Sequence, residues 1–361
     1  MKPKTRHACS TFFLSTPGAG LVGHNLDDYI EVPGLVITNP RGIAKGNISW
    51  QDLTSFRSKF RPRIQWVAKY GSITGNIFGR EFPDGGLNEA GLYIGEMTLF
   101  GTKYPPAPGL PKLYHCQWMQ YILDNFETVD QVLASLSHII MDGHCQWHFF
   151  TADKHGHTAS IEFPSGKTVI HSGEQMPVKV MCNAAYAEEL AHLSEYEGFG
   201  GAKPVDIDDR QGNARFVQAA TMLQQYESAP RQPAVDEAFA ILAQLERGNN
   251  KWSIVFDLSQ MRVYFRTYRE REIKYVDFSA FDLSSAAPTM IRDIHQPGTG
   301  EVSGQFHPCN DADNRVAIRE TWAQIDFGNA FLNRFFKPIL VWKLSSYPKG
   351  FTAQKKDRSH R

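Results

Sequence analysis

Short runs in which apolar and polar residues alternate dominate the N-terminal third of the chain. A period of two is typical of strands that bury one face. The run over 10–27 is interrupted by Pro17-Gly18, a turn pair, and therefore predicts a hairpin. Further apolar runs predict strands at 34–38, 64–70 and 92–99, and Asp84-Gly85-Gly86 predicts a turn ahead of the last one.

The apolar period becomes helical between 113 and 136. Within this stretch Thr128 and Gln131 form a capping-box pattern before an apolar face, which predicts a second helix there. The order of elements that follows predicts an α+β fold of stacked sheets and helices. Its strands are expected at 146–153, 158–163, 178–183, 252–258, 261–267 and 273–278, and its helices near 187–196, 213–227 and 234–247.

Past residue 283 the pattern loosens into segments rich in Ser, Gly and Pro. We therefore predict a main domain over 9–283 and a C-terminal extension over 284–361. The extension is expected to hold one helix near 316–335 and a disordered, basic tail. At the other end, residues 1–8 are basic and lack the apolar segment of a secretory signal.

Charge and composition give no sign of nucleic-acid or membrane binding. The formal net charge is zero and the pI is near 7.2, which gives no overall attraction to nucleic acid or membrane surfaces. No apolar run is long enough to span a bilayer. We expect a cytoplasmic protein, or a periplasmic or secreted one if the true start lies upstream of Met1. A homo-oligomer is compatible with this sequence.

The five cysteines form no CxxC pair, so neither a disulfide framework nor a zinc site is expected, and no cofactor is predicted. His144 and His148 have a spacing that would suit a metal on a helix. The surrounding residues read as a strand, however, where the two side chains would lie about 13 Å apart.

Cys9 is the candidate nucleophile. A cysteine that becomes the first residue of a mature chain gains a free α-amino group with a pKa of about 7.7–8.0, which can take the thiol proton. Residues 1–8 would then be a leader that is removed on maturation. The predicted hairpin also brings Cys9 close to the polar cluster His24, Asn25 and Asp27. Taken alone, the spacing equally allows a buried, inert cysteine.

Several motifs follow one another along the chain: Cys9-Ser10-Thr11, Gly23-His24-Asn25-Leu26-Asp27, Asp84-Gly85-Gly86-Leu87-Asn88-Glu89-Ala90-Gly91-Leu92, His148-Phe149-Phe150-Thr151-Ala152-Asp153 with Ile161-Glu162, Val180-Met181-Cys182-Asn183 and Asn213-Ala214-Arg215-Phe216. Over roughly residues 9–280 the chain thereby resembles the choloylglycine hydrolase and penicillin V acylase family. The members of that family are linear amide hydrolases with an N-terminal nucleophile, and the resemblance implies a four-layer αββα sandwich.

The resemblance also implies roles for individual residues. Cys9 would attack the amide carbonyl, and Asp27 would hold its amino group or thiol. Asn183 would donate to the developing oxyanion, and Arg215 would polarise the site or pair with Asp27. The substrate would be an N-acylated small molecule of the bile-salt, penicillin V or N-acyl-amine type.

Two residues depart from the family pattern. His24 stands where bile-salt hydrolases carry arginine, and a neutral imidazole there would make activity more sensitive to pH. Thr98 stands where those enzymes have a second oxyanion asparagine. An acyltransferase on the same scaffold and a non-catalytic binding module of the same fold therefore remain alternatives.

Overall fold

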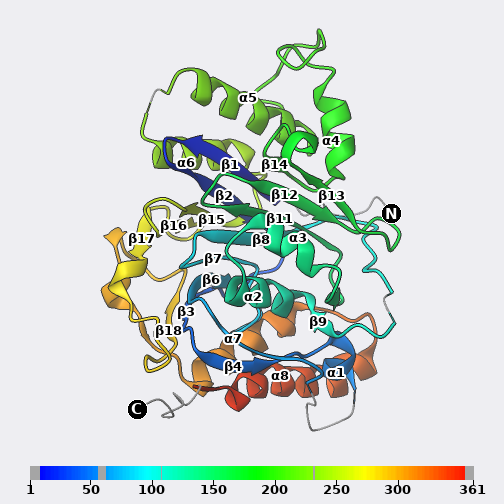
Figure 1. The fold of residues 1–361 in the computed structure, drawn as a ribbon, viewed down its shortest axis with the longest axis vertical. Coiled ribbons are helices and arrows are strands. Elements are labelled where there is room, and N and C mark those ends of the chain that lie inside the picture. Colours follow the sequence, from blue (N-terminus) through cyan, green and yellow to red (C-terminus); the bar gives the residue numbers. More distant parts are fainter. Residues whose placement is uncertain (1–8, 56–61, 107, 231, 354–361) are drawn as a thin grey trace, which may run out of the picture.

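Two large sheets are stacked between layers of helices in the computed structural model, which describes residues 9–55, 62–106, 108–230 and 232–353 (Figure 1). The first sheet has seven strands and is antiparallel except at the β17–β19 edge. In spatial order these are β14 (Val180–Met181), β1 (Ser10–Thr16), β2 (Ala19–Asp27), β15 (Asn250–Asp257), β16 (Arg262–Thr267), β17 (Lys274–Asp277) and β19 (Gly300–Glu301).

The second sheet has nine antiparallel strands and lies directly beneath the first in Figure 1. Its spatial order is β13 (Val169–Ser172), β12 (Thr158–Glu162), β11 (Trp147–Asp153), β8 (Leu92–Thr98), β7 (Gly85–Asn88), β6 (Ser72–Asn76), β3 (Leu35–Asn39), β18 (Met290–Asp293) and β20 (His307–Pro308). Strand β18 lies beyond residue 283 and pairs with β3, so part of the C-terminal region completes this sheet.

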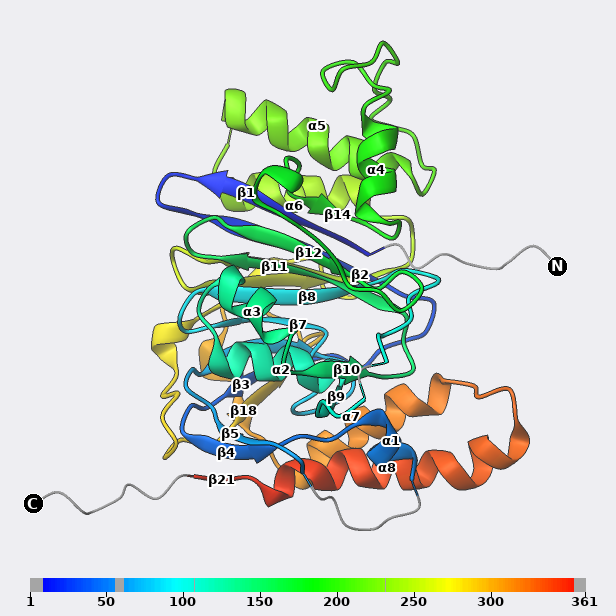
Figure 2. The ribbon, with the colours of Figure 1, turned by 45° about the vertical axis from the view of Figure 1, so that its right-hand side comes forward.

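Helices cover the outer face of each sheet, which gives the predicted αββα order (Figures 1 and 2). One layer packs on β1, β2 and β15, and the other packs on β7, β8 and β11. The first layer consists of α4 (Tyr186–Leu193), α5 (Ala214–Ser228) and α6 (Ala234–Leu245), and the second of α2 (His115–Asn125) and α3 (Val129–Ser135). As predicted, the Thr128 side chain caps α3 by accepting from the Gln131 N–H.

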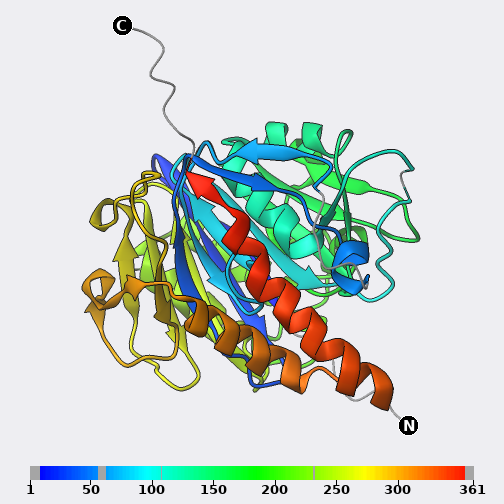
Figure 3. The ribbon, with the colours of Figure 1, turned by 90° about the horizontal axis from the view of Figure 1, so that it is seen from below.

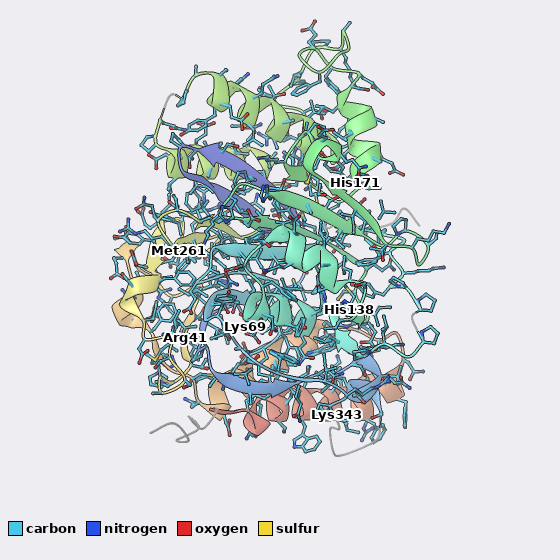
Figure 4. All side chains as sticks on the ribbon, in the orientation of Figure 1. Arg41, Lys69, His138, His171, Met261 and Lys343 are labelled. Atoms are coloured by element: carbon cyan, nitrogen blue, oxygen red, sulfur yellow. The ribbon has the colours of Figure 1, made fainter. Side chains whose placement is uncertain are left out.

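A further group of elements lies beyond α2 (Figure 2). In this group α7 and α8 run side by side (Figure 3), and Lys343 of α8, labelled in Figure 4, donates to the carbonyl of Asp52 in α1 at 2.7 Å. The elements are α1 (Trp50–Thr54), α7 (Asp311–Gln324), α8 (Lys337–Ser346), the three-stranded sheet β21 (Thr352–Ala353), β4 (Ile43–Gly46) and β5 (Gln65–Val67), and the parallel pair β9 (Lys112–Tyr114) and β10 (Ile140–Asp142). None of the described helices is long and apolar enough to cross a bilayer.

The N-terminal hairpin is confirmed. Gly18 turns the chain with a positive φ of 97°, and β1 and β2 then pair from Thr16↔Ala19 to Ser10↔Asn25. A close approach fixes this register: a Cβ at Gly23 would lie 2.3 Å from the Phe12 ring, so the aromatic ring occupies the space above the glycine. The pairing brings Cys9 to the end of β2.

Three local expectations were wrong. Asp84-Gly85-Gly86 begins β7 and not a turn, because the Thr74 methyl fills the space above Gly86, 2.5 Å from where a Cβ would stand. The single helix expected near 316–335 is interrupted: α7 ends at Gln324, a connection in which Gly328 has a φ of 66° follows, and a π-helical turn over Leu332–Phe336 leads into α8. His144 precedes β11 and does not share a strand with His148. The expected leader over 1–8 and the basic tail from 354 lie outside the described residues.

Candidate active site

Cys9 lies at the open end of the hairpin, where β1 begins and β2 ends. Its side chain is only 2% exposed, and its Sγ is 3.7 Å from the backbone carbonyl oxygen of Asp27, to which the thiol donates. Burial raises the pKa of the Cys9 thiol well above its usual value, and the negative charges of Glu96 and Asp27 add to this. With the chain uncut, the thiol is therefore held in its neutral form.

Asp27 is fully buried and has one hydrogen-bond partner for two carboxylate oxygens. Asn250, which pairs with Asp27 across β2 and β15, donates to Oδ1 at 3.0 Å. The other oxygen, Oδ2, has no partner among the described residues. Burial raises the pKa of Asp27 to about 7, although the Asn250 hydrogen bond and the charge of Arg215 act in the opposite direction.

Arg215 joins three parts of the site from the first turn of α5. Its Nη1 donates to the Cys9 carbonyl at 2.6 Å and to the Ser10 hydroxyl at 2.8 Å, and its Nη2 donates to Asn183 Oδ1 at 2.9 Å. The guanidinium holds its N–H donors in one fixed plane. Its Nη1 can therefore bond to Cys9 and Ser10 while its Nη2 bonds to Asn183. Arg215 is 3% exposed, which shields these bonds from water.

Asn183 follows β14, the strand that pairs with β1, and its amide is held at both ends. Arg215 binds its oxygen, and its Nδ2 donates to the carbonyl oxygen of Thr98 at 2.7 Å. Thr98 ends β8 and contributes its backbone carbonyl to this contact. The amide nitrogen carries two hydrogens, and the Thr98 contact uses one of them.

His24 pairs with Thr11, two residues further along β1 than Cys9. Its Nδ1 is 2.7 Å from the Thr11 hydroxyl and 3.3 Å from the Tyr93 hydroxyl, and burial lowers the pKa of His24 to about 4. The fold thus brings together five of the six residues singled out from the sequence (Cys9, Asp27, Thr98, Asn183 and Arg215) and places His24 in the contact between the sheets.

Two cavities meet at this site. The first, of about 350 Å³, borders Cys9, Asp27 and Thr98 and is otherwise lined mainly by apolar side chains such as Leu26, Phe78 and Trp147. The second, of about 700 Å³, borders Asn183 and Arg215. It contains two further arginines, Arg210 and Arg247, and two glutamates, Glu189 and Glu246. Phe100 lies on the wall of both.

Charge differs between the two cavities. In the second, burial together with the neighbouring charges of Arg215 and Arg210 lowers the pKa of Arg247 to about 10, which indicates closely spaced guanidinium groups. The first contains the carboxyl group of Glu96, which is 2% exposed. His144 and Cys145 also border the first cavity and, with His115, place three potential metal ligands within 4.8 Å of one another.

Sequence reasoning missed Asn250, Ser10 and Glu96. Asn250 could have been found from strand register, because it stands where β15 meets the end of β2. The aromatic-rich segments around 56–66 and 93–104 are candidates, from the sequence, for the lining of an acyl pocket. Of these, Phe100 borders the cavity beside Cys9, whereas Trp66 donates to Asp124 in a separate buried cluster. Residues 56–61 of that expectation lie outside the described residues.

Comparison with known proteins agrees with this geometry. Residues 9–291 match the family model described as linear amide C–N hydrolases, choloylglycine hydrolase family. A penicillin V acylase of Pectobacterium atrosepticum is 26% identical over 294 residues, which cover 68% of this chain and 77% of that protein.

Two solved structures share the fold. Penicillin V acylase from Agrobacterium tumefaciens superposes with a TM-score of 0.71 at 22% identity, covering 84% of this chain and 98% of that one. A variant of conjugated bile acid hydrolase from Clostridium perfringens gives a TM-score of 0.65 at 17% identity, covering 81% of this chain and 99% of that one. The resemblance inferred from the motifs and the sandwich fold that it implied are both confirmed.

Proposed function

Because this chain belongs to the choloylglycine hydrolase family of linear amide C–N hydrolases, we propose that it matures by cleavage before Cys9 and then uses that cysteine as nucleophile. The substrate is an N-acylated small molecule. One observation carries the proposal: beside Cys9, a buried carboxylate oxygen of Asp27 has no partner among the described residues. Cleavage would create an α-ammonium or amine at Cys9, a donor that could pair with this oxygen.

The free amine provides the base that the uncut chain lacks. The Cys9 thiol passes its proton to the amine as Sγ bonds to the amide carbonyl carbon, which forms a tetrahedral intermediate. As the intermediate collapses, the C–N bond breaks and the same proton leaves on the departing amine. Water then attacks the thioester, releases the carboxylic acid and restores the thiol.

Asn183 stabilises the negative oxygen of that intermediate. Its second Nδ2 hydrogen is the donor, and Arg215 and the Thr98 carbonyl keep the amide in place before substrate arrives. A donor that is already oriented costs no reorganisation during the reaction, and loss of one such donor typically lowers kcat by about 10²–10³-fold.

The two cavities suggest how the substrate lies. The acyl group enters the first, mainly apolar cavity beside Cys9, where burial of each methylene contributes about 0.8 kcal/mol. The amine portion points toward the second cavity, whose arginines favour a leaving group that carries a negative charge. Glycine or taurine conjugates and phenoxyacetyl-type penicillins have this polarity.

Mass spectrometry of the purified protein tests maturation directly, and loss of residues 1–8 is the expected result. A panel of N-acyl substrates then tests turnover, with Cys9→Ala expected to abolish both cleavage and activity. Addition of an amine acceptor separates hydrolysis from acyl transfer. An intact Met1 in protein that also fails to react with a thiol-directed probe at Cys9 would sink the proposal.

A further inference from the structure

A cluster of three metal-ligand side chains borders the cavity that contains Cys9. His115 opens α2, whereas His144 and Cys145 lie in the turn ahead of β11. Their ligand atoms lie within 4.8 Å of one another, and His144 and Cys145 are on the cavity wall. The proposed amide hydrolysis uses none of the three.

The hydrogen bonds of the two imidazoles are those expected of metal ligands. His115 Nδ1 is 3.2 Å from the Cys116 Sγ, and His144 Nδ1 is 3.4 Å from the Tyr114 hydroxyl. Because these partners contact Nδ1 of each ring, the Nε2 atom of each ring faces Cys145. Metal-binding histidines generally use one ring nitrogen for the metal and the other for such an outer partner, which fixes the ring.

One ligand pair already has a suitable distance. His144 Nε2 is 3.4 Å from Cys145 Sγ, whereas His115 Nε2 accepts a hydrogen bond from the Cys145 backbone N–H at 3.4 Å and would exchange it for the metal. In a tetrahedral zinc site, a nitrogen and a sulfur ligand are roughly 3.5 Å apart, given Zn–S and Zn–N bonds of about 2.3 and 2.1 Å. The His144–Cys145 pair therefore already has the spacing of one edge of the tetrahedron.

Aromatic rings hold His144 in this orientation. Trp50 stacks on the imidazole with ring centroids 4.6 Å apart, and the ring of Trp322 lies at 5.1 Å. Trp50 covers a face of the imidazole and Trp322 is tilted by 40° against it, whereas the contact of Nε2 is with Cys145 Sγ. An enclosed, apolar surround of this kind limits water access and strengthens coordination.

A buried cation also needs compensating negative charge. A Cys145 thiolate supplies one. Glu96 lies on the wall of the same cavity, is 2% exposed and has an Oε2 with no partner among the described residues. A divalent ion would be neutral overall with this thiolate and an ionised Glu96.

We propose that His115, His144 and Cys145 form a binding site for a divalent cation of the Zn²⁺ class, with the fourth coordination position open to the cavity beside Cys9. Two nitrogen ligands and one thiolate favour Zn²⁺ or Co²⁺ over Mg²⁺ or Ca²⁺, which prefer oxygen ligands. On binding, the S–Zn bond forms, the Cys145 proton leaves to solvent and the ion gives up a water. This inference stands apart from the amide hydrolysis, because it needs neither cleavage before Cys9 nor turnover.

Titration of the full-length, metal-free protein with Co²⁺ tests the site. We expect one ion per chain, visible d–d bands of a four-coordinate complex and a near-ultraviolet sulfur-to-cobalt band, with Zn²⁺ displacing Co²⁺. Cys145→Ser should abolish the sulfur band and weaken Co²⁺ binding by about 100-fold or more, since losing even an outer partner costs about 10–100-fold. His144→Gln should weaken binding similarly.

Two matched controls make the result specific. Cys309→Ser removes a thiol far along the chain, and Cys9→Ala removes the thiol across the cavity; both should keep the sulfur band and the affinity. Zn²⁺ should also raise the thermal midpoint of the wild type but not that of Cys145→Ser, which covers the case in which His144→Gln does not fold. Absence of Co²⁺ binding, or a sulfur band that survives in Cys145→Ser, would overturn the proposal.

Discussion

The substitution Asp27→Asn tests how the buried charge of Asp27 affects the stability of the uncut chain, independently of catalysis. Asp27 is fully buried, and its Oδ2 has no partner among the described residues. Asparagine has the same shape but no charge to desolvate. The comparison is made in a Cys9→Ala background, where no thiol can initiate cleavage and the α-amino group is expected to stay absent.

The sign follows from the direction of the pKa shift. Burial raises the pKa of Asp27 from 3.8 to about 7 in the folded protein. An acid with a raised folded-state pKa destabilises the fold as it ionises: it has no effect below the unfolded pKa, and the free energy of unfolding falls as pH rises toward the folded pKa. Above about pH 7 the loss is complete and constant.

The magnitude can be worked out for a convenient pH range. Each pKa unit corresponds to about 1.4 kcal/mol. Between pH 5 and the folded pKa of about 7, the Asp27 protein should therefore lose about 3 kcal/mol relative to Asp27→Asn. Burial also raises the pKa of Asp84 and of Glu189 to about 8. Both residues are present in the two proteins compared, so their titration cancels in this difference.

Urea denaturation at pH 5 and pH 8.5 measures the free energy of unfolding of both proteins. Asp277→Asn is the matched control: this carboxylate pairs with Arg262 and its pKa is lowered, so its substitution should have the same effect at both pH values. An Asp27→Asn difference that is equal at pH 5 and pH 8.5 would refute the reasoning. In protein with a free Cys9 amine, the pH dependence should shrink, since the ammonium pairs with the carboxylate.

Two further substitutions test the buried charges. Arg215→Lys should lower kcat by about 10²–10³-fold because lysine lacks the planar guanidinium fork that bonds to the Cys9 carbonyl and to Asn183 through separate nitrogens. Steady-state kinetics against Arg210→Lys, which changes the neighbouring cavity wall, checks this. Lys45→Met should lower the free energy of unfolding by about 3–5 kcal/mol, since Lys45 neutralises buried Glu81 and Asp124 at 2.7 and 3.0 Å. Thermal or chemical denaturation measures this loss. The control is Arg41→Met, which removes a surface ion pair with Glu89 and should lower the free energy of unfolding by less than about 1 kcal/mol (Arg41 is labelled in Figure 4).

The local sequence pattern predicted the structure correctly where one short segment determines it. Pro17-Gly18 sets the hairpin, and Thr128 sets the start of α3, because each acts on residues close to it in sequence. Asp84-Gly85-Gly86 has turn composition but forms strand β7, since Thr74 and Leu123 from other elements occupy the space above Gly86. Contacts between distant segments overrode the local preference there.

The residues of the candidate site divide in the same way, into those that a local motif indicates and those that only the fold brings together. Motifs indicated Cys9, Asp27, Asn183 and Arg215 because each stands in a recognisable local string. Asn250 has no such string and lies 223 residues from Asp27, to which it donates. His115 and Glu96 likewise acquire their significance only from the cavity that the fold builds around Cys9.

His24 shows how a residue can depart from a family pattern and yet lie away from the chemistry. It stands where relatives have arginine, which predicted a pH-sensitive anchor beside the nucleophile. In the fold its ring contacts Thr11 and Tyr93, and with a pKa of about 4 it stays neutral at any pH near neutrality. The cation that contacts the Cys9 backbone is Arg215. Sensitivity to pH between 5 and 8 should therefore come from Asp27 and the Cys9 amine, and His24→Gln should leave the pH profile of turnover unchanged.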